Sequence, residues 1–337
     1  MSKMKAWKLI KYGKDFKAGM EILEVDKPTP ADDEVLIECH AAALNPVDYK
    51  IAEGQLKLFY KQKMPAGLAF DCSGVVAEVG KKVEHLKVGD EVFCTTPTDS
   101  PGVLAEFVAV KADVITQKPK NLSHAEAAGF AMVGLTTISC MEAVKLKAGE
   151  KILIHAGSGG IGSFAIQYAR QLGAEVFTTT STSNVDWVEE LGAKVIDYKK
   201  EDYRKEVPQL DVVYDTLGGD FTTDAFPLLS PGGRVVSIAG RRLDEETAEQ
   251  YGLNWLFKWF MKLQLRPIKK LCKKYDASYK FILNEPNMER LTKLKKALET
   301  GYIKPVINHT YSFDQVVEAF EMQQSGRSKG KNVVLIK

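Results

Sequence analysis

Three glycines in residues 153–171 have the spacing of a phosphate-binding turn. The stretch LIHAGSGGIGSFAIQYARQ places Gly157, Gly159 and Gly162 between an apolar strand pattern and a helix pattern. Glycine lets the backbone approach a ligand where a β-carbon would collide, and a helix start offers unpaired N–H groups at the positive end of its dipole. This strand-to-helix context predicts a dinucleotide cofactor. The alternative is a tight turn that binds nothing.

The segment about 20 residues further on indicates which dinucleotide is bound. NAD-binding strands usually end there in an acid that bonds the ribose 2′-hydroxyl. Here TTTSTSN supplies Ser181, Thr182 and Asn184, and the first acid is Asp186. A carboxylate would repel a 2′-phosphate, whereas small hydroxyl and amide donors can bond one, so we expect NADP(H). The same residues could instead cap the helix that follows.

The elements around this turn alternate in type. Strand patterns at residues 151–157, 175–181, 194–198, 210–218 and 234–240 are separated by helix patterns at 162–174, 185–193 and 220–233. Such alternation predicts a parallel sheet with helices on both faces.

The remaining elements frame this region. An Ala-rich helix pattern at 123–144 precedes it and opens with a capping box, Ser123 and Glu126. The first 120 residues hold short apolar runs bounded by Gly, Pro and Asp, which predict a compact, partly antiparallel barrel. After residue 278 we expect a strand, two helices and a last strand.

Composition restricts the class of protein. The 337 residues are long enough for two domains, and the formal charge of +2 gives no case for a nucleic-acid partner. The five cysteines are scattered, which is typical of a reduced, cytoplasmic chain. We expect neither a secretory signal nor a membrane-spanning helix, because no apolar run is long enough.

Several motifs together resemble one known superfamily. ALNPVDYKIAEG, FDCSGVVAEVG, HAGSGGIG, YDTLGG and GRSKGKNVVLIK are similar to the medium-chain dehydrogenase/reductase superfamily, in particular its zinc-free quinone oxidoreductase branch of zeta-crystallin-like and enone or alkenal reductases. The resemblance implies an α/β chain with a GroES-like β-barrel catalytic domain, residues 1–121 and 285–337. A Rossmann domain with a doubly wound parallel sheet, residues 122–284, is inserted between them, with the active site in the cleft.

The resemblance also implies site residues. NPVDYK would line the nicotinamide and substrate cleft, which makes Asn45, Tyr49 and Lys50 the catalytic candidates. The implied cofactor-binding residues are Lys50, Thr136, Ser158, Gly159, Gly160, Ile161, Ser181, Thr182, Asn184, Tyr198, Leu217 and Lys331. Alternatively, the residues after Asn45 only open a short helix, with Lys50 solvated or gripping the cofactor.

The positions at which zinc-dependent relatives hold a catalytic metal carry other residues in this chain. Asn45 and Phe70 match the first two ligand positions, and the third falls near Met132. Cys94 stands alone where a structural zinc would need four clustered cysteines. We therefore expect no metal.

Hydride transfer without a metal needs an activated acceptor, such as a quinone or an α,β-unsaturated aldehyde or ketone. Asn45, Tyr49 or Lys50 could then bond the oxygen on which negative charge builds. We expect a zinc-independent, NADPH-dependent oxidoreductase of small quinones or enones and enals, cytoplasmic and homodimeric. The alternatives are a zinc-type alcohol dehydrogenase, or an NADPH-binding sensor or membrane-associated protein without significant turnover.

Residues 253–275 do not fit the alternating pattern. They hold Trp255, Phe257, Trp259 and Phe260 with seven Lys and Arg and no acid. Three interpretations stay open: a cleft lid or oligomer contact, a buried apolar face with a solvated basic face, and a peripheral membrane contact with anionic lipid.

Overall fold

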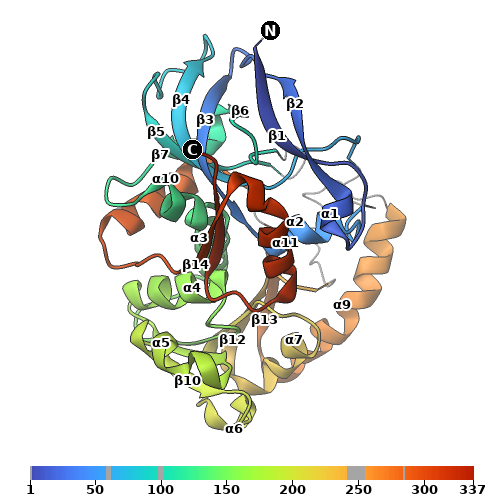
Figure 1. Cartoon of the computed structure of the whole chain (residues 1–337). Helices are drawn as coiled ribbons and strands as arrows, with labels where there is room; N and C mark the ends of the chain where they lie inside the picture. The colour runs from blue at the N-terminus through green and yellow to red at the C-terminus, as the bar shows by residue number, and fades with distance from the viewer. Residues whose placement is uncertain (1, 58–61, 98–101, 241–254, 284) are drawn as a thin grey trace. The chain divides into compact units, whose positions relative to one another are not determined.

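The computed structural model describes residues 2–57, 62–97, 102–240, 255–283 and 285–337 (Figure 1). Its contacts divide the chain into unit 1, Met1–Leu135 with Glu285–Lys337, and unit 2, Thr136–Asn284. The first division falls inside helix α3 (His124–Val144), whereas the sequence places a boundary just before that helix, after residue 121. Leu253 and Asn254 of the basic aromatic stretch lie outside the described residues.

Unit 1 is built mainly of strands. The strands are β1 (Lys3–Leu9), β2 (Met20–Asp26), β3 (Glu34–Leu44), β4 (Asp71–Val79), β5 (Glu91–Thr95), β6 (Phe107–Lys111), β7 (Ile115–Gln117), β14 (Ile307–Ser312) and β15 (Lys331–Leu335). The helices are α1 (Phe16–Gly19), α2 (Pro46–Ala52), α10 (Met288–Glu299), α11 (Val316–Ser325) and the first part of α3, with short 3-10 turns η1 (Ala112–Val114) and η4 (Phe313–Gln315).

The strands of unit 1 wrap around one apolar core. Among the described residues, seven strands form a sheet, with the order β14-β15-β3-β4-β5-β7 and β6 paired to β3, and β1 and β2 form a separate antiparallel hairpin. The C-terminal tail joins this sheet because β15 pairs antiparallel with β3, with Asn332 opposite Leu44. This hairpin is not among the predicted elements, although KMKAWKL places the buried Met4, Ala6 and Leu9 beside lysines that are exposed or half-buried.

Unit 2 contains a second sheet. Its strands are β8 (Lys151–Ile154), β9 (Glu175–Thr180), β10 (Lys194–Asp197), β11 (Leu210–Asp215), β12 (Leu229–Ser237) and β13 (Ser278–Phe281). Its helices are α4 (Gly160–Gln171), α5 (Val185–Glu190), α6 (Tyr203–Glu206), α7 (Asp220–Asp224) and α9 (Trp255–Tyr275), with 3-10 turns η2 (Thr182–Asn184) and η3 (Phe226–Leu228). All pairings within this sheet are parallel, which confirms the predicted parallel sheet.

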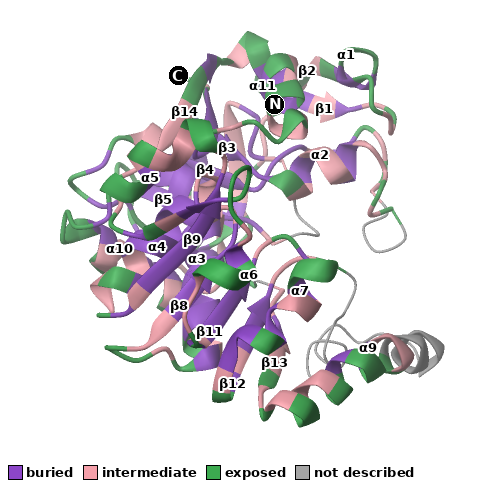
Figure 2. Ribbon diagram, turned by 90° about the horizontal axis from the view of Figure 1, so that it is seen from below, coloured by how far each residue is buried: buried purple, intermediate pink, exposed green. Residues whose placement is uncertain are grey.

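Both faces of this sheet are covered. Ile152 and Ile154 pack with apolar residues of α4 and α5, whereas Leu153, which points to the opposite face, packs with residues of α9. Figure 2 shows most of β8 and β11 as buried, and β12 as buried mainly in its second half. Strands buried on both sides need near-continuous apolar sequence, which KILI and LDVVYD supply.

The strand order β10-β9-β8-β11-β12-β13 reverses direction between β8 and β11. In doubly wound sheets, ligands bind at the carboxyl ends of the strands beside such a reversal. The residues that follow β8, β9, β10 and β11 are polar, namely His155, Ser181, Tyr198 and Thr216. A ligand site is therefore expected at the carboxyl edge of this sheet.

The predicted helix at residues 220–233 is wrong in its second half. α7 ends at Asp224, η3 ends at Leu228, and β12 begins at Leu229. Pro231 has no N–H for a helical bond, and Gly232 adopts a φ of 80°. The N–H of Gly232 instead donates to the carbonyl of Asp276 at 2.6 Å, so tertiary contacts extend the strand.

Among the described residues, α3 is the one helix long and apolar enough to cross a membrane by length and composition. Most of its apolar window is buried inside the protein. Ala128 packs with Ala41 and Ala43 in unit 1, and Cys140 and Met141 belong to the core of unit 2. Core packing therefore accounts for its apolar sequence.

Candidate functional site

The turn after β8 forms a cradle in which glycine is required. A β-carbon on Gly157 would lie 2.3 Å from Thr178 Oγ1. One on Gly162 would lie 2.2 Å from the carbonyl oxygen of Ala156. Gly159 is the N-cap of α4 and has no side chain that could cap the helix. The first N–H groups of α4 are thus available for an anion such as a pyrophosphate.

The predicted pyrophosphate contacts lie at the surface of this cradle. The four residues are partly exposed: Ser158, Gly159, Gly160 and Ile161. A β-carbon on Gly159 would make no contact closer than 3.4 Å, so packing does not require glycine there. A ligand that approaches the backbone would require it.

The predicted 2′-phosphate contacts meet after β9. Asn184 Nδ2 donates to Ser181 Oγ at 3.0 Å, and Trp187 Nε1 donates to Asn184 Oδ1 at 3.1 Å. Hydrogen bonds between side chains of residues 181–187 therefore hold η2 in place. Thr182 is exposed, and its hydroxyl bonds the carboxylate of Asp197, which lowers the pKa of Asp197.

Two cations, Lys199 and Lys200, follow Tyr198 at the end of β10 and are not among the predicted site residues. Tyr198 is 52% exposed, and the Nζ of Lys199 lies 5.2 Å from the centroid of its ring. Lys200 Nζ lies 3.6 Å from Asp197 Oδ2 and offsets that negative charge. The parallel pairing of β10 with β9 places both lysines beside the end of β9.

The loop after β11 is shaped by a buried carboxylate. Asp215 Oδ1 accepts the N–H groups of Leu217 at 3.0 Å and Gly218 at 2.7 Å. Its Oδ2 accepts the hydroxyls of Thr222 at 2.5 Å and Ser237 at 2.9 Å. This arrangement presents Leu217, which is 46% exposed, at the same edge of the sheet. The motif YDTLGG contained this aspartate, but not its four partners.

His155 lies at this edge and packs against two aromatic rings. Its ring is T-shaped to those of Tyr203 and Phe221, each with centroids 5.1 Å away. Its Nδ1 lies 3.4 Å from Thr179 Oγ1. Burial lowers the pKa of His155 to about 4, although the nearby charge of Asp215 opposes that shift. The ring is therefore neutral at physiological pH.

Unit 1 holds a second polar cluster around Asn45, the residue before α2. The side chain of Asn45 donates to Asp71 Oδ2 at 2.7 Å and accepts from Lys331 Nζ at 2.5 Å. Lys331 Nζ also lies 3.6 Å from Asp71 Oδ2, and both residues are buried. The N–H of Met132 completes the cluster by donating to Asp71 Oδ1 at 3.1 Å.

The charges of this cluster nearly cancel. The backbone N–H of Asn45 donates to Asp48 Oδ2 at 2.6 Å, and Asp48 Oδ1 is buried with no bonding partner. Burial raises the pKa of Asp48 to about 8, and the charge of Asp71 acts in the same direction. Asp48 therefore carries a proton at neutral pH, and the Lys331 ammonium balances the remaining carboxylate.

The structure places most of the predicted site residues in two groups, one in each unit. Ser158 to Ile161, Ser181 to Asn184, Tyr198 and Leu217 share one edge of the parallel sheet. Asn45 and Lys331 bond each other inside unit 1, so their polar atoms serve the buried cluster. Tyr49 and Lys50 are half-buried on α2, and Thr136 is buried in α3.

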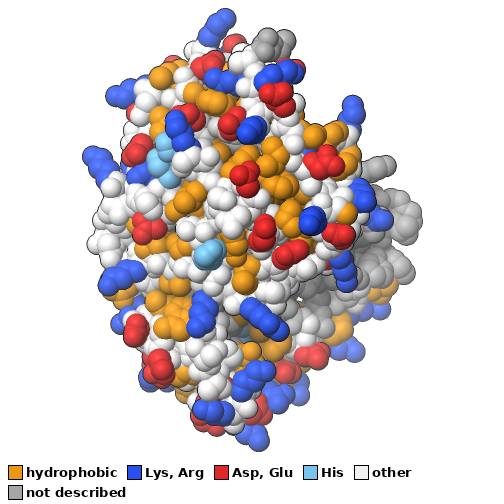
Figure 3. All heavy atoms as spheres, in the orientation of Figure 1, with side chains coloured by type: hydrophobic (Ala, Val, Ile, Leu, Met, Phe, Trp, Pro, Cys, Tyr) orange, Lys and Arg blue, Asp and Glu red, His pale blue; other side chains and the backbone are white. Residues whose placement is uncertain are grey.

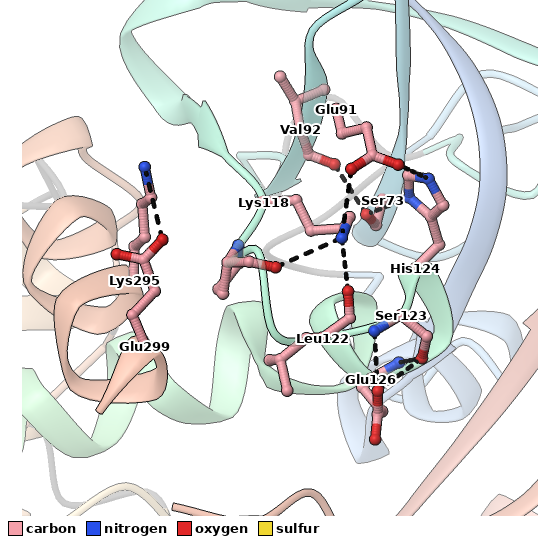
Figure 4. Close-up of polar contacts among 11 residues, drawn as sticks. Ser73, Glu91, Val92, Lys118, Leu122, Ser123, His124, Glu126, Lys295 and Glu299 are labelled. Carbon is pink, nitrogen blue, oxygen red and sulfur yellow. Dashed lines mark hydrogen bonds and ion pairs between the residues drawn. The ribbon is translucent and has the colours of Figure 1, made fainter. Parts of the chain in front are cut away.

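A serine, a histidine and a glutamate also come together in unit 1, as Figure 4 shows. Ser73 Oγ lies 2.8 Å from His124 Nδ1, and His124 Nε2 lies 3.4 Å from Glu91 Oε1. Yet the Ser73 hydroxyl donates to the carbonyl of Val92 at 2.7 Å, and Ser73 is fully buried. The cluster therefore lacks an accessible nucleophile and does not support a hydrolase.

Family models match most of this architecture. Residues 31–120 match the alcohol dehydrogenase GroES-like domain, and residues 191–334 match the zinc-binding dehydrogenase model. The chain is 34% identical over 348 aligned positions to 2-methylene-furan-3-one reductase of Solanum lycopersicum, covering 99% of this chain and 79% of that protein. The chain belongs to the medium-chain dehydrogenase/reductase superfamily.

Two further relatives place it within the superfamily. It is 32% identical to the NADPH-dependent alkenal/one oxidoreductase, chloroplastic, of Arabidopsis thaliana, over 98% of this chain and 79% of that one. The structure of the quinone oxidoreductase from Coxiella burnetii matches with a TM-score of 0.85 and 30% identity, over the whole of both chains. These findings confirm the zinc-free branch, the GroES-like plus Rossmann fold and a nicotinamide-dependent oxidoreductase.

The zinc named in one matched description does not fit the residues of this superfamily member. Asn45 is bonded within the buried cluster, and Phe70 is apolar and buried. Cys94 Sγ lies 3.5 Å from Cys72 Sγ in the apolar core of unit 1. Across the described ranges, no three His, Cys, Asp or Glu side chains are grouped to hold a metal. We therefore assign no step to a metal.

Removal of the Lys331 ammonium should destabilise the protein. Lys331→Met leaves the Asp71 carboxylate buried without its counter-charge, and we expect the free energy of unfolding to fall by about 3 kcal/mol. The double variant Asp71→Asn/Lys331→Met removes both charges and should recover most of that loss. Urea unfolding of the four proteins in the cycle measures the coupling. Simple additivity of the two single losses would contradict the ion pair.

His155 should make stability depend on pH. Its folded pKa of about 4 lies below the unfolded value of 6.5, so only the unfolded chain takes up the proton as the pH falls through that window. This contribution is complete above pH 6.5. Between about pH 7.5 and about pH 5, wild type should lose about 2 kcal/mol that His155→Phe does not lose. Urea unfolding at both pH values tests this, and equal losses in both proteins would count against it.

Proposed function

We propose that this chain is a zinc-independent, NADPH-dependent reductase of quinones or α,β-unsaturated carbonyl compounds. The observation that carries the proposal is the glycine cradle at the start of α4, in a member of the zinc-free branch. The names of the relatives support the substrate class, because they include a 2-methylene-furan-3-one reductase, an alkenal/one oxidoreductase and a quinone oxidoreductase. When bound, NADPH supplies a hydride.

The preference for NADPH is supported by the ends of β9 and β10. Ser181 and Asn184 offer a hydroxyl and an amide, and residues 181–185 contain no carboxylate. Lys199 and Lys200 follow Tyr198 at the neighbouring strand end, where cations favour a phosphate. Of the acids at this strand end, Asp197 is offset by Thr182 and Lys200, and Glu201 accepts the N–H of Asp197.

The choice of substrate follows from the absence of a suitable metal-donor set among the described residues. No Lewis acid is then at hand to polarise a simple ketone, so the acceptor must be electrophilic by itself. Tyr49 and Lys50 stay the proposed hydrogen-bond donors to the oxygen that gains charge. Burial raises the pKa of Tyr49, which keeps its hydroxyl protonated. Asn45 is better suited to position α2, because Asp71 and Lys331 use its side chain.

The reaction class is tested by NADPH oxidation against a panel of acceptors, with NADH in parallel. We expect turnover with 9,10-phenanthrenequinone, 1,4-benzoquinone, 2-hexenal or an enone, and none with a saturated ketone. Turnover with the saturated ketone alone would contradict the metal-free argument and favour an alcohol dehydrogenase. Tight NADPH binding without turnover on any acceptor would instead favour a sensor.

Cofactor preference is tested by Ser181→Asp. The new carboxylate can still accept the bond from Asn184, so the turn should survive, but it repels a 2′-phosphate. We expect the Kd for NADPH to rise about 10- to 100-fold while the Kd for NADH changes little. Ser278→Asp, at an exposed residue that begins β13 on the opposite edge of the sheet, is the matched control. Equal weakening of both cofactors by Ser181→Asp would show that the 2′-phosphate is not bound there.

A homodimer and a cytoplasmic location are proposals of the same kind. The five cysteines are free, and four of them are buried, which suits a reducing compartment. Light scattering of the purified chain would measure the oligomeric state.

A further inference from the structure

One side of helix α9 packs against the core of unit 2. Within residues 262–275, Leu265 and Ile268 are 3% and 1% exposed and pack with Leu153 and Val213 of the sheet. Leu271, Cys272 and Tyr275 lie partly buried against the same core. The apolar side of this part of the helix is therefore already occupied.

The opposite side of the helix carries only cations as charged groups. The exposed basic residues are Lys262, Arg266, Lys269, Lys270, Lys273 and Lys274. At 3.6 residues per turn they fall within an arc of about 140°, on the side away from Ile268, Leu271 and Tyr275. Residues 255–275 contain no Asp or Glu. We call these six residues the basic stripe. Figure 2 shows exposed residues along the described part of α9, and Figure 3 shows the Lys and Arg side chains on one face of the molecule.

Four of the six residues of the basic stripe carry charges that no acid among the described residues balances. Within the part of the protein that the structure describes, Lys262, Arg266, Lys270 and Lys273 make no ion pair. Arg266 and Lys270, and Lys270 and Lys274, are neighbours four residues apart on the helix, and like charges at that spacing repel. An anionic surface would relieve this repulsion along the whole stripe.

We propose that the basic stripe binds the surface of an anionic lipid bilayer. Four to eight basic residues on an amphipathic helix are typical of such binding. The stripe is about 18 Å long on the convex side of a helix, so a flat surface can meet all of it at once. Because the apolar side of residues 262–275 is buried in the core, this part of α9 adsorbs through charge without inserting, and binding is reversible and sensitive to salt.

Two other anionic partners fit the stripe less well. Protein interfaces are depleted in lysine at their centres and rely on aromatic and apolar anchors, which the exposed side of residues 262–275 does not offer. The formal net charge of +2 gives no overall attraction to the phosphates of DNA, on which nucleic-acid binding depends. A bilayer requires only the exposed side.

The test is co-sedimentation of the full chain with vesicles of phosphatidylcholine alone or with about a third phosphatidylserine. We expect binding only to the anionic vesicles at about 0.1 M salt, and release at about 0.5 M. Lys270→Gln/Lys273→Gln/Lys274→Gln should lower the partition coefficient roughly 100-fold without changing NADPH oxidation in solution.

The matched control removes the same number of charges elsewhere. Lys81→Gln/Lys87→Gln/Lys147→Gln neutralises three exposed lysines outside α9 and should leave binding nearly unchanged. Equal loss in both triple variants, binding to neutral vesicles, or no binding to anionic vesicles at low salt would each overturn the proposal. Stripe-dependent binding to duplex DNA or to polyglutamate, without vesicle binding, would assign the stripe to a different partner and overturn it as well.

Discussion

The ion pair between Lys331 and Asp71 is the interaction on which unit 1 depends. Lys331 begins β15, Asp71 begins β4, and Asn45, which bonds both, precedes α2. A buried carboxylate without a counter-charge would cost several kcal/mol, so β15 must be in place before this centre is satisfied. The C-terminal tail is thus part of the folding unit that the first residues of the chain begin.

In unit 2, backbone N–H groups lie at the carboxyl edge of the sheet and need acceptors. The open N–H groups of α4 and the carboxylate of Asp215 lie after neighbouring strands, on either side of the point where the strand order reverses. At α4 the donors are left open toward a ligand. At Asp215 four donors are used up within the protein, which makes that loop a rigid support. Binding and support are therefore separated along one edge of the sheet.

The sequence predicts unit 2 better than unit 1. The strand and helix patterns after residue 151 are local, and the glycine turn needs only the neighbouring residues, so both are readable without tertiary information. The cluster of Asn45, Asp71 and Lys331 joins residues up to 286 positions apart, and no local pattern indicates such a partnership. Lys331 illustrates the limit, because its motif does not indicate the ion pair that holds its ammonium inside unit 1. The early start of β12 has the same origin, since Asp276 supplies the bond that extends it.

Leu217 is exposed, yet the four donors on Asp215 hold its loop in place. The conformational entropy of that segment has already been lost during folding. A ligand that packs against this leucine would therefore bind without a further ordering cost in the loop. Removal of the hydrogen bonds to Asp215 would weaken the binding of such a ligand, because the loop would then lose entropy on binding, even though no contact with the ligand had been removed.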